Sequence, residues 1–151
     1  MRKLFKFRID KPHIDGRTAM ALAVFPGIIL MVLQYIFLEY NVYTWYFPQL
    51  DIPMHILGGA SVAWAAWVGI AYSIRIKKLP KLPFWFAIIF AVGVAAIVGI
   101  AWEFYEFIGD VINNTSQQMW QFGPGDTMKD FADDIIGAVL LSIAVGKKML
   151  K

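Results

Sequence analysis

The chain has 151 residues, a length typical of one domain, and 59% of them are hydrophobic. Its mean hydropathy of +0.58 and its long apolar blocks exceed what a soluble core needs, so the composition predicts an integral membrane protein. Because the sequence has no cysteine, it excludes disulfides, thiolate metal ligands and a thiol nucleophile. The net charge of +3 does not indicate nucleic-acid binding, because the basic residues gather in short flanking segments.

The first 17 residues form a basic segment that also carries apolar side chains. Six of the fourteen Lys and Arg residues lie here, and Leu4, Phe5, Phe7 and Ile9 stand among them. This pattern is typical of a segment that lies on the membrane surface against anionic lipid headgroups. The segment either recognises a specific lipid or, as we favour, is only the positively charged flank of the first membrane span.

Four apolar stretches follow, and each is long enough for a helix that crosses much or all of the bilayer, which takes about 20 residues. The predicted spans are residues 18–40, 51–73, 84–109 and 130–146, and residues 147–151 form a basic tail. Short loops join the spans, so we expect an all-α, four-helix transmembrane bundle. The sequence leaves homo-oligomerisation open.

Charge is distributed unequally between the two ends of this bundle. Thirteen of the fourteen basic residues belong to the N-terminal segment, the loop RIKKLPKLP and the C-terminal tail. By the positive-inside rule these segments are cytoplasmic, which predicts an inner-membrane protein with both termini in the cytoplasm. Nine of the eleven acidic residues then lie at the extracytoplasmic end: Glu39, Asp51, Glu103, Glu106, Asp110, Asp126, Asp130, Asp133 and Asp134.

The last span opens with three acids on one helical face. Asp126, Asp130 and Asp134 are four residues apart, so they stack one above the other and repel. A cation, a basic partner, bound protons or a wet cavity must compensate for this repulsion. Upstream, Gly123-Pro-Gly125 predicts a turn, with Asp126 or Thr127 as the helix cap.

The beginnings of the second and fourth spans resemble each other. DIPMHILGGA and DFADDIIGA both read Asp, three residues, a polar residue, two aliphatic residues, Gly and a small residue. The spans before them end in IFLEY and AWEFYEF, each with Glu beside an aromatic residue. Two helical hairpins repeated in parallel around an axis along the membrane normal would give this pattern.

A histidine and several further acids stand at helical spacing near the same end. Asp51 and His55 are one turn apart on one face, and Glu103 and Glu106 are neighbours on another helix. Glu103 lies about 10 Å inside the end of its helix, where an ionised carboxylate is costly and marks a functional interior. In a bundle these faces converge with that of Asp134, so we expect one polar pocket open to the extracytoplasmic side.

Carboxylates with one imidazole suit a divalent cation: Mg²⁺, Mn²⁺, Ca²⁺ or, with only one histidine available, less readily Zn²⁺. Paired acids could instead share a proton, as general acid–base catalysis requires. Asp51 and Asp126 are further members of the site. The predicted metal ligands are His55, Glu103, Glu106, Asp130 and Asp134, of which Glu103, His55 and Glu106 are also the predicted catalytic residues.

Simpler interpretations compete with this one. Asp126 and Asp130 stand where the helix dipole favours acids. His55 could be a neutral residue bonded to Glu103 across helices, a structural pair without chemistry. A Ser-His-Asp triad is poorly supported, because Ser61 lies on a different helical face from His55.

Three motifs together resemble a known family. DxxxH in the second span, WExxE at the end of the third and GD…DxxxD…GA at the fourth are similar to the small YjdF-like inner-membrane proteins, and more distantly to the VanZ-like family. The resemblance covers residues 51–138. The VanZ-like pattern has Gln and Asn where this chain has Glu106 and Asp134, which argues against transferring that family's glycopeptide-resistance role. The matching positions are Asp51, His55, Glu103, Glu106, Asp126, Asp130 and Asp134.

The cytoplasmic halves of the predicted spans distinguish a transport function from an enzymatic or binding function. They are nearly bare of polar groups, apart from Tyr72, Ser73 and Ser142, whereas a permeation path needs polar groups at every depth. We therefore expect a blind pocket and a metal-assisted hydrolase or transferase acting on a lipid-linked phosphate. The alternative is a non-catalytic protein that binds membrane lipids or a partner, of the envelope-stress or antibiotic-resistance type, and an ion or metal transporter is less favoured.

Overall fold

The computed structural model describes residues 15–40, 42, 48–112 and 123–150. These residues form four long helices, α1 (Gly16–Glu39), α3 (Asp51–Arg75), α4 (Phe84–Ile112) and α5 (Pro124–Met149), and a short 3-10 turn at Pro48–Leu50. The described residues contain no strand, so the predicted all-α four-helix bundle is confirmed. The basic segment up to residue 14 lies outside the described residues.

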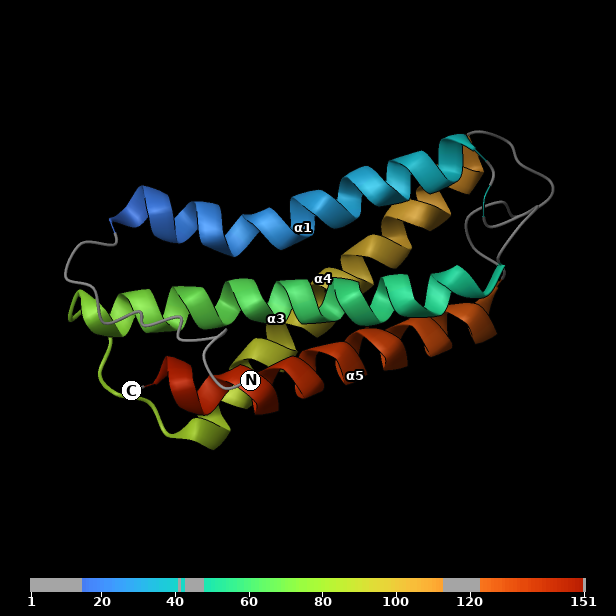
Figure 1. Ribbon diagram of the computed structural model, residues 1–151. Helices are drawn as coiled ribbons and strands as arrows, with labels where there is room; N and C mark the ends of the chain where they lie inside the picture. Colours follow the sequence, from blue (N-terminus) through green and yellow to red (C-terminus); the bar gives the residue numbers. More distant parts are fainter. Residues whose placement is uncertain (1–14, 41, 43–47, 113–122, 151) are drawn as a thin grey trace, which may run out of the picture.

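Consecutive helices run in opposite directions, and α3 is the central one (Figure 1). It packs against α1, α4 and, most extensively, α5. Helix α4 runs obliquely behind α3, from near the C-terminal end of α5 to near the C-terminal end of α1. The ends of α1 and α4 and the beginnings of α3 and α5 therefore lie at the same end of the bundle.

Three of the helices, α1, α3 and α4, are long and apolar enough to cross a membrane. Helix α5 has 26 residues and is thus about 39 Å long, which is also sufficient. Acids in its first turns and Lys147 and Lys148 in its last turn restrict its uncharged stretch to residues 135–146. Since helix ends do not mark membrane boundaries, the limits of the four spans stay predictions.

Helix α5 begins earlier than the expected cap. Gly123 is the N-cap, with φ at 106°, a conformation that favours glycine, and Pro124 occupies the first helical turn. The backbone N–H of Asp126 already donates to the carbonyl of Gly123 at 3.0 Å. The prediction of Asp126 or Thr127 as the cap is therefore wrong, because proline pre-sets the helical φ two residues upstream.

Helix α1 packs mainly against α3, and one of these contacts compensates for a proline. Pro26 lies inside α1 and has no N–H, so the carbonyl of Leu22, four residues earlier, loses its helical donor. The indole Nε1 of Trp64 on α3 donates to that carbonyl at 2.8 Å. Only Ala19 is buried among the 24 residues of α1. Most of the other α1 side chains are exposed, as expected of a helix that faces lipid.

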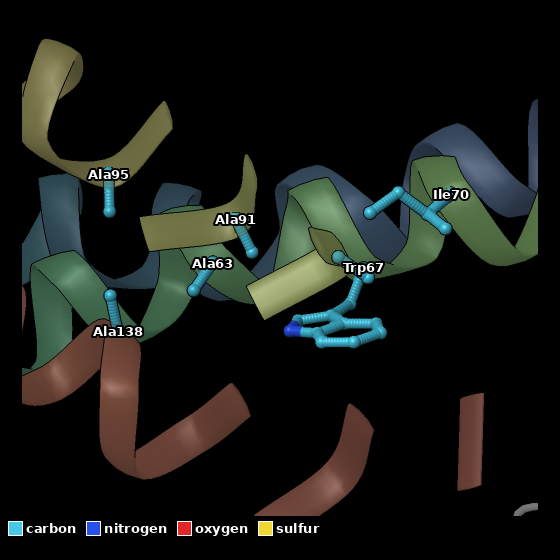
Figure 2. Packing of buried hydrophobic residues seen from close by; sticks show 7 residues of the cluster. Ala63, Trp67, Ile70, Ala91, Ala95 and Ala138 are labelled. Carbon is cyan, nitrogen blue, oxygen red and sulfur yellow. The ribbon is translucent and has the colours of Figure 1, made fainter. Parts of the chain in front are cut away.

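The half of the bundle distant from the acids is filled by small residues around one large one (Figure 2). Trp67 is fully buried, and its Nε1 donates to Ser142 Oγ at 2.9 Å. Both side chains thus have their polar groups satisfied inside the bundle. The core cluster consists of Ala63, Trp67, Ile70, Ala87, Ala91, Ala95 and Ala138.

Glycines allow α3 and α5 to approach until their backbones touch. A Cβ at Gly59 would overlap the backbone carbonyl of Asp134, and one at Gly137 would overlap the carbonyl of Ile56. Small residues at such crossings are what close helix packing in lipid requires. This crossing fixes the depth at which Asp134 meets α3.

Candidate functional site

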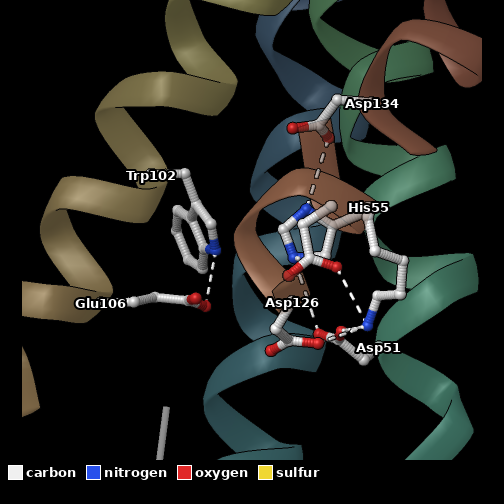
Figure 3. Close-up of polar contacts among 8 residues, drawn as sticks. Asp51, His55, Trp102, Glu106, Asp126 and Asp134 are labelled. Carbon is white, nitrogen blue, oxygen red and sulfur yellow. Dashed lines mark hydrogen bonds and ion pairs between the residues drawn. The ribbon is translucent and has the colours of Figure 1, made fainter. Parts of the chain in front are cut away.

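The buried titratable residues gather where α3 and α5 begin and α4 ends (Figure 3). Helix α3 contributes a histidine from its second turn, α4 two glutamates from its last turns, and α5 two aspartates. Helical spacing places each pair on the inner face of its helix. Among the described residues, the buried acids and histidines are His55, Glu103, Glu106, Asp130 and Asp134.

His55 lies between carboxylates from two helices. Its Nδ1 is 3.5 Å from Asp134 Oδ1, and its Nε2 is 3.6 Å from Asp51 Oδ1 and 3.8 Å from Asp130 Oδ1. A carboxylate on one ring nitrogen orients the imidazole and leaves the other nitrogen for a ligand. Asp134 can serve in this way, since Gly58 and Gly99 leave room for its side chain.

Lys129 provides the basic partner for part of the acidic face. Its Nζ lies 2.7 Å from Asp126 Oδ1, 2.8 Å from Asp51 Oδ2 and 3.2 Å from Asp130 Oδ1. Burial by itself would lower the pKa of Lys129, but its hydrogen bonds to Asp126 and Asp51 outweigh that effect and raise the pKa. The ammonium therefore stays charged at neutral pH and offsets the repulsion among three of the acids.

Glu106 is held by an aromatic residue of its own helix. The Nε1 of Trp102 donates to Glu106 Oε1 at 2.7 Å, and both side chains project from α4 toward His55 (Figure 3). A hydrogen bond to a carboxylate is stronger than one between neutral groups. Trp102 is thus a positioning residue for Glu106 and also lines the adjoining cavity.

Two sets of three residues have ligand atoms close enough to bind one metal ion. One set is Asp51, His55 and Asp130, and the other is His55, Glu103 and Glu106; within each, one ligand atom from every residue lies within 4.8 Å of the others. In the first set Lys129 already contacts both aspartates. In the second set all three residues are buried, and no ion pair from Lys129 to either glutamate is observed among the described residues.

The residues of the repeated motif meet one another. His55 and Asp134, which occupy the same place in the two motifs, are in contact, and Asp51 and Asp130, also equivalent, both approach His55 Nε2 and both bind Lys129. Helices α3 and α5 run in the same direction. This is the arrangement expected of two parallel hairpins, α1–α3 and α4–α5, around an axis along the bundle.

A cavity of about 270 Å³ adjoins the site and is lined by residues of α1, α3, α4 and α5. Its polar end is formed by Gln34, Asp51, His55 and Asp134. The remainder is mainly apolar, with Leu30, Met31, Val62, Ala95 and Val98 among its lining residues. The site is thus one end of an apolar cavity rather than an isolated polar cluster.

All five residues predicted as metal ligands are buried at this end, with Asp51 beside them. Asp126 contacts Lys129 and is not among the residues of either metal-binding set found on the described chain. Sequence reasoning missed Lys129 and Trp102 as members of the site. A signal existed for Lys129, which is the one basic residue at the acidic end and lies three residues after Asp126.

Comparison with known proteins identifies the family. Residues 5–150 match the family described as "Predicted membrane protein (DUF2238)", so the chain belongs to this family and is a membrane protein. Neither the curated proteins nor the solved structures contain a match.

Proposed function

We propose that this member of the DUF2238 family binds a divalent cation through His55, Glu103 and Glu106 and uses it to hydrolyse or transfer a lipid-linked phosphate. The observation that carries the proposal is the second metal-binding set: three buried side chains from two helices with ligand atoms within 4.8 Å of one another. Burying two carboxylates beside each other is costly unless a cation or a proton accompanies them.

The neighbouring set is the weaker candidate for the metal. Lys129 Nζ lies 2.8 Å from Asp51 and 3.2 Å from Asp130, so an ammonium already occupies the space between those carboxylates. A divalent cation there would have to displace the lysine. Asp134, beside Nδ1, would then orient His55 and leave Nε2 for the cation, the role that outer carboxylates play at metal-bound histidines.

The chemistry would follow from the donor set and the cavity. A divalent cation polarises a phosphate oxygen and stabilises the charge that develops during displacement. Glu106, which Trp102 orients, is the candidate base for the attacking hydroxyl. His55, Glu103 and one carboxylate oxygen of Glu106 would hold the cation, and the adjoining cavity would provide an apolar place for the remainder of the substrate.

The opposite half of the bundle supports a blind pocket rather than a pathway. Trp67 is completely buried there, and Ser142, one of the few polar groups at that depth, accepts its indole N–H. An ion moving through this region would meet few oxygen ligands in an otherwise apolar interior. Transport is therefore the least supported function.

A non-catalytic role in binding a lipid or a protein partner is the second candidate. The observation in its favour is Lys129, whose ammonium contacts three acids and offsets part of their negative charge without any external ion. A purely structural network could extend this pattern to Glu103 and Glu106 by sharing a proton. The YjdF-like and VanZ-like resemblance of the motifs belongs to this proposal, because it suggests the same residues without deciding between catalysis and binding.

Thermal unfolding of the purified protein tests for the metal. We expect Mn²⁺, Mg²⁺, Ca²⁺ or Zn²⁺ to raise the free energy of unfolding by about 2.7 kcal/mol when the free metal is at 100 times its Kd. Glu103→Gln, which keeps the shape and removes the charge, should abolish this shift, and the exposed Glu39→Gln should retain it. If EDTA and every metal leave the wild-type transition unchanged, the residues form a proton-sharing network instead.

Turnover separates the two functional candidates. Wild-type protein in liposomes should release phosphate from, or transfer it between, lipid phosphates when the cation is present, and His55→Ala and Glu103→Gln should each abolish this activity while the helical content stays unchanged. Metal binding without activity toward a panel of lipid phosphates would favour the binding protein. Metal-dependent ion flux across the sealed bilayer would refute the blind pocket.

The proposed orientation places the site on the extracytoplasmic side of the inner membrane, with both termini in the cytoplasm. Since the chain has no cysteine, single cysteines report accessibility without background. A cysteine at the exposed Gln49 should react with an impermeant reagent from outside, and one at the exposed Lys78 only from the cytoplasm. The reverse pattern would overturn the orientation.

A further inference from the structure

We propose that the cavity beside the site holds one hydrocarbon chain of a membrane lipid, which enters from the bilayer between α1 and α4 with its headgroup at His55 and Asp134. The identity of the headgroup as a phosphate rests on the proposed function. The capture of the chain does not, because it depends on the walls of the cavity and not on the metal.

The volume and the lining of the cavity indicate what can fill it. Its volume of about 270 Å³ is close to the lower limit of small-molecule pockets, and most of its lining surface is apolar. The apolar part of the cavity offers water few hydrogen-bond partners, and its lining atoms lose dispersion contacts when nothing occupies it. Within a bilayer the abundant apolar filler is the hydrocarbon chain of a lipid.

The mouth of the cavity is marked by residues that line it and are nevertheless exposed. Met31 on α1 is 55% exposed and Val98 on α4 is 43% exposed. Helix α1 makes its extensive contacts with α3 alone, so α1 and α4 border the mouth without packing closely against each other. Both are apolar membrane-spanning helices, and the opening between them therefore faces lipid.

The polarity of the cavity sets the direction of the bound chain. Asp51, His55 and Asp134 line one end, at the beginnings of α3 and α5, whereas Val62 and Ala95 line the part nearer the filled core. A lipid would gain most by placing its polar group at the first end and its chain against the second. The headgroup would thus meet His55, which also belongs to the proposed metal-binding set.

A substitution that narrows the mouth of the cavity tests whether a lipid hydrocarbon chain occupies it. Val98→Trp adds bulk at a lining position, and Ile97→Trp places the same side chain at the neighbouring position, which is 68% exposed and is not among the cavity's lining residues. Protein taken from bilayer nanodiscs into EDTA-containing buffer is analysed by native mass spectrometry. We expect one lipid bound to each wild-type and Ile97→Trp chain, and at least a tenfold smaller bound fraction for Val98→Trp. Equal lipid retention by both variants would overturn the proposal.

Photo-crosslinking keeps the proposal falsifiable if Val98→Trp fails to fold. Wild-type protein is placed in vesicles that contain a phospholipid with a diazirine at the end of its acyl chain, or a polyprenyl phosphate with a diazirine on its chain. Crosslinks should map to Leu30, Val62 or Ala95. The lipid probe that crosslinks more efficiently identifies the kind of hydrocarbon chain. Crosslinks confined to the exposed outer faces of α1 and α4 would overturn the proposal.

The same variants separate this proposal from the proposed function. Metal-induced stabilisation should persist in Val98→Trp, because the substitution lies outside the ligand set. If Val98→Trp loses the lipid but is still stabilised by metal, the result supports the binding of a hydrocarbon chain in the cavity. Lipid bound to the wild type when no metal shift occurs would refute the metal proposal and leave the chain site standing.

Discussion

The two ends of the α3–α4–α5 bundle are built from the same helices but have interiors of opposite polarity. At one end four acids and one histidine are buried, and a lysine, an indole N–H and the cavity lie beside them. At the other end the interior holds alanines, one isoleucine and one tryptophan, with its single N–H bonded to a serine. Polar side chains in an apolar environment need partners or space, whereas apolar ones need only complementary shapes.

This difference predicts that packing stability comes mainly from the filled end and ligand binding from the acidic end. The filled end holds the helices together, which allows the other end to keep charged groups and an open volume that would not by themselves favour folding. Substitutions at the filled end should therefore change the free energy of unfolding, and substitutions at the acidic end should mainly change ligand binding. Two variants test this division, and a third tests the helix crossing at Gly59 and Asp134.

Removal of the Trp67 side chain should lower the free energy of unfolding more than the other substitutions. Trp67→Ala deletes a fully buried side chain and leaves Ser142 without its donor, so we expect a loss of about 3–5 kcal/mol in the free energy of unfolding. Equilibrium unfolding in mixed micelles measures this loss. Trp85→Ala, at a position that is 63% exposed, is the matched control and should change stability little. Equal losses in both variants would contradict the division between the two ends.

A methyl group at the helix crossing should have the next largest effect. The Cβ of Gly59→Ala would overlap the backbone carbonyl of Asp134, so α3 and α5 must separate at a cost of about 1–3 kcal/mol. Gly69→Ala is the control on the same helix, because nothing lies within 4 Å of its Cβ, and its stability should be unchanged or raised. Wild-type stability in Gly59→Ala would show that the crossing adjusts freely.

Removal of the ammonium from the acidic end should have the smallest effect on stability. The Lys129 side chain is 38% exposed, so solvent screens its ion pairs and Lys129→Met should cost on the order of 1 kcal/mol. With the ammonium gone, Asp51 and Asp130 become available to a divalent cation, and added metal should stabilise this variant more than the wild type. Lys148→Met, at an exposed position, is the control. An unchanged response to metal in Lys129→Met would show that these aspartates do not bind cations.

The sequence by itself determined the fold class and the end of the bundle at which the acids lie. Apolar stretches of membrane length can satisfy their backbone groups only as helices, and the spacing of Asp126, Asp130 and Asp134 places them on one face whatever the rest of the chain does. The motif shared by the second and fourth spans likewise indicated that Asp51 and His55 have counterparts in Asp130 and Asp134.

Only the tertiary structure decided which of these residues contact one another. Helical periodicity fixes the faces of each helix but not the rotation and depth of one helix against another, and here the backbone contacts at Gly59 and Gly137 set both. They bring Lys129 among three acids and leave the cavity beside His55. Four of the five predicted ligands fall into two groups that share His55, one of which also includes Asp51, whereas Asp134 belongs to neither group. Even the first turn of α5 depended on local geometry, because Gly123 and Pro124 start the helix before the acids that were expected to cap it.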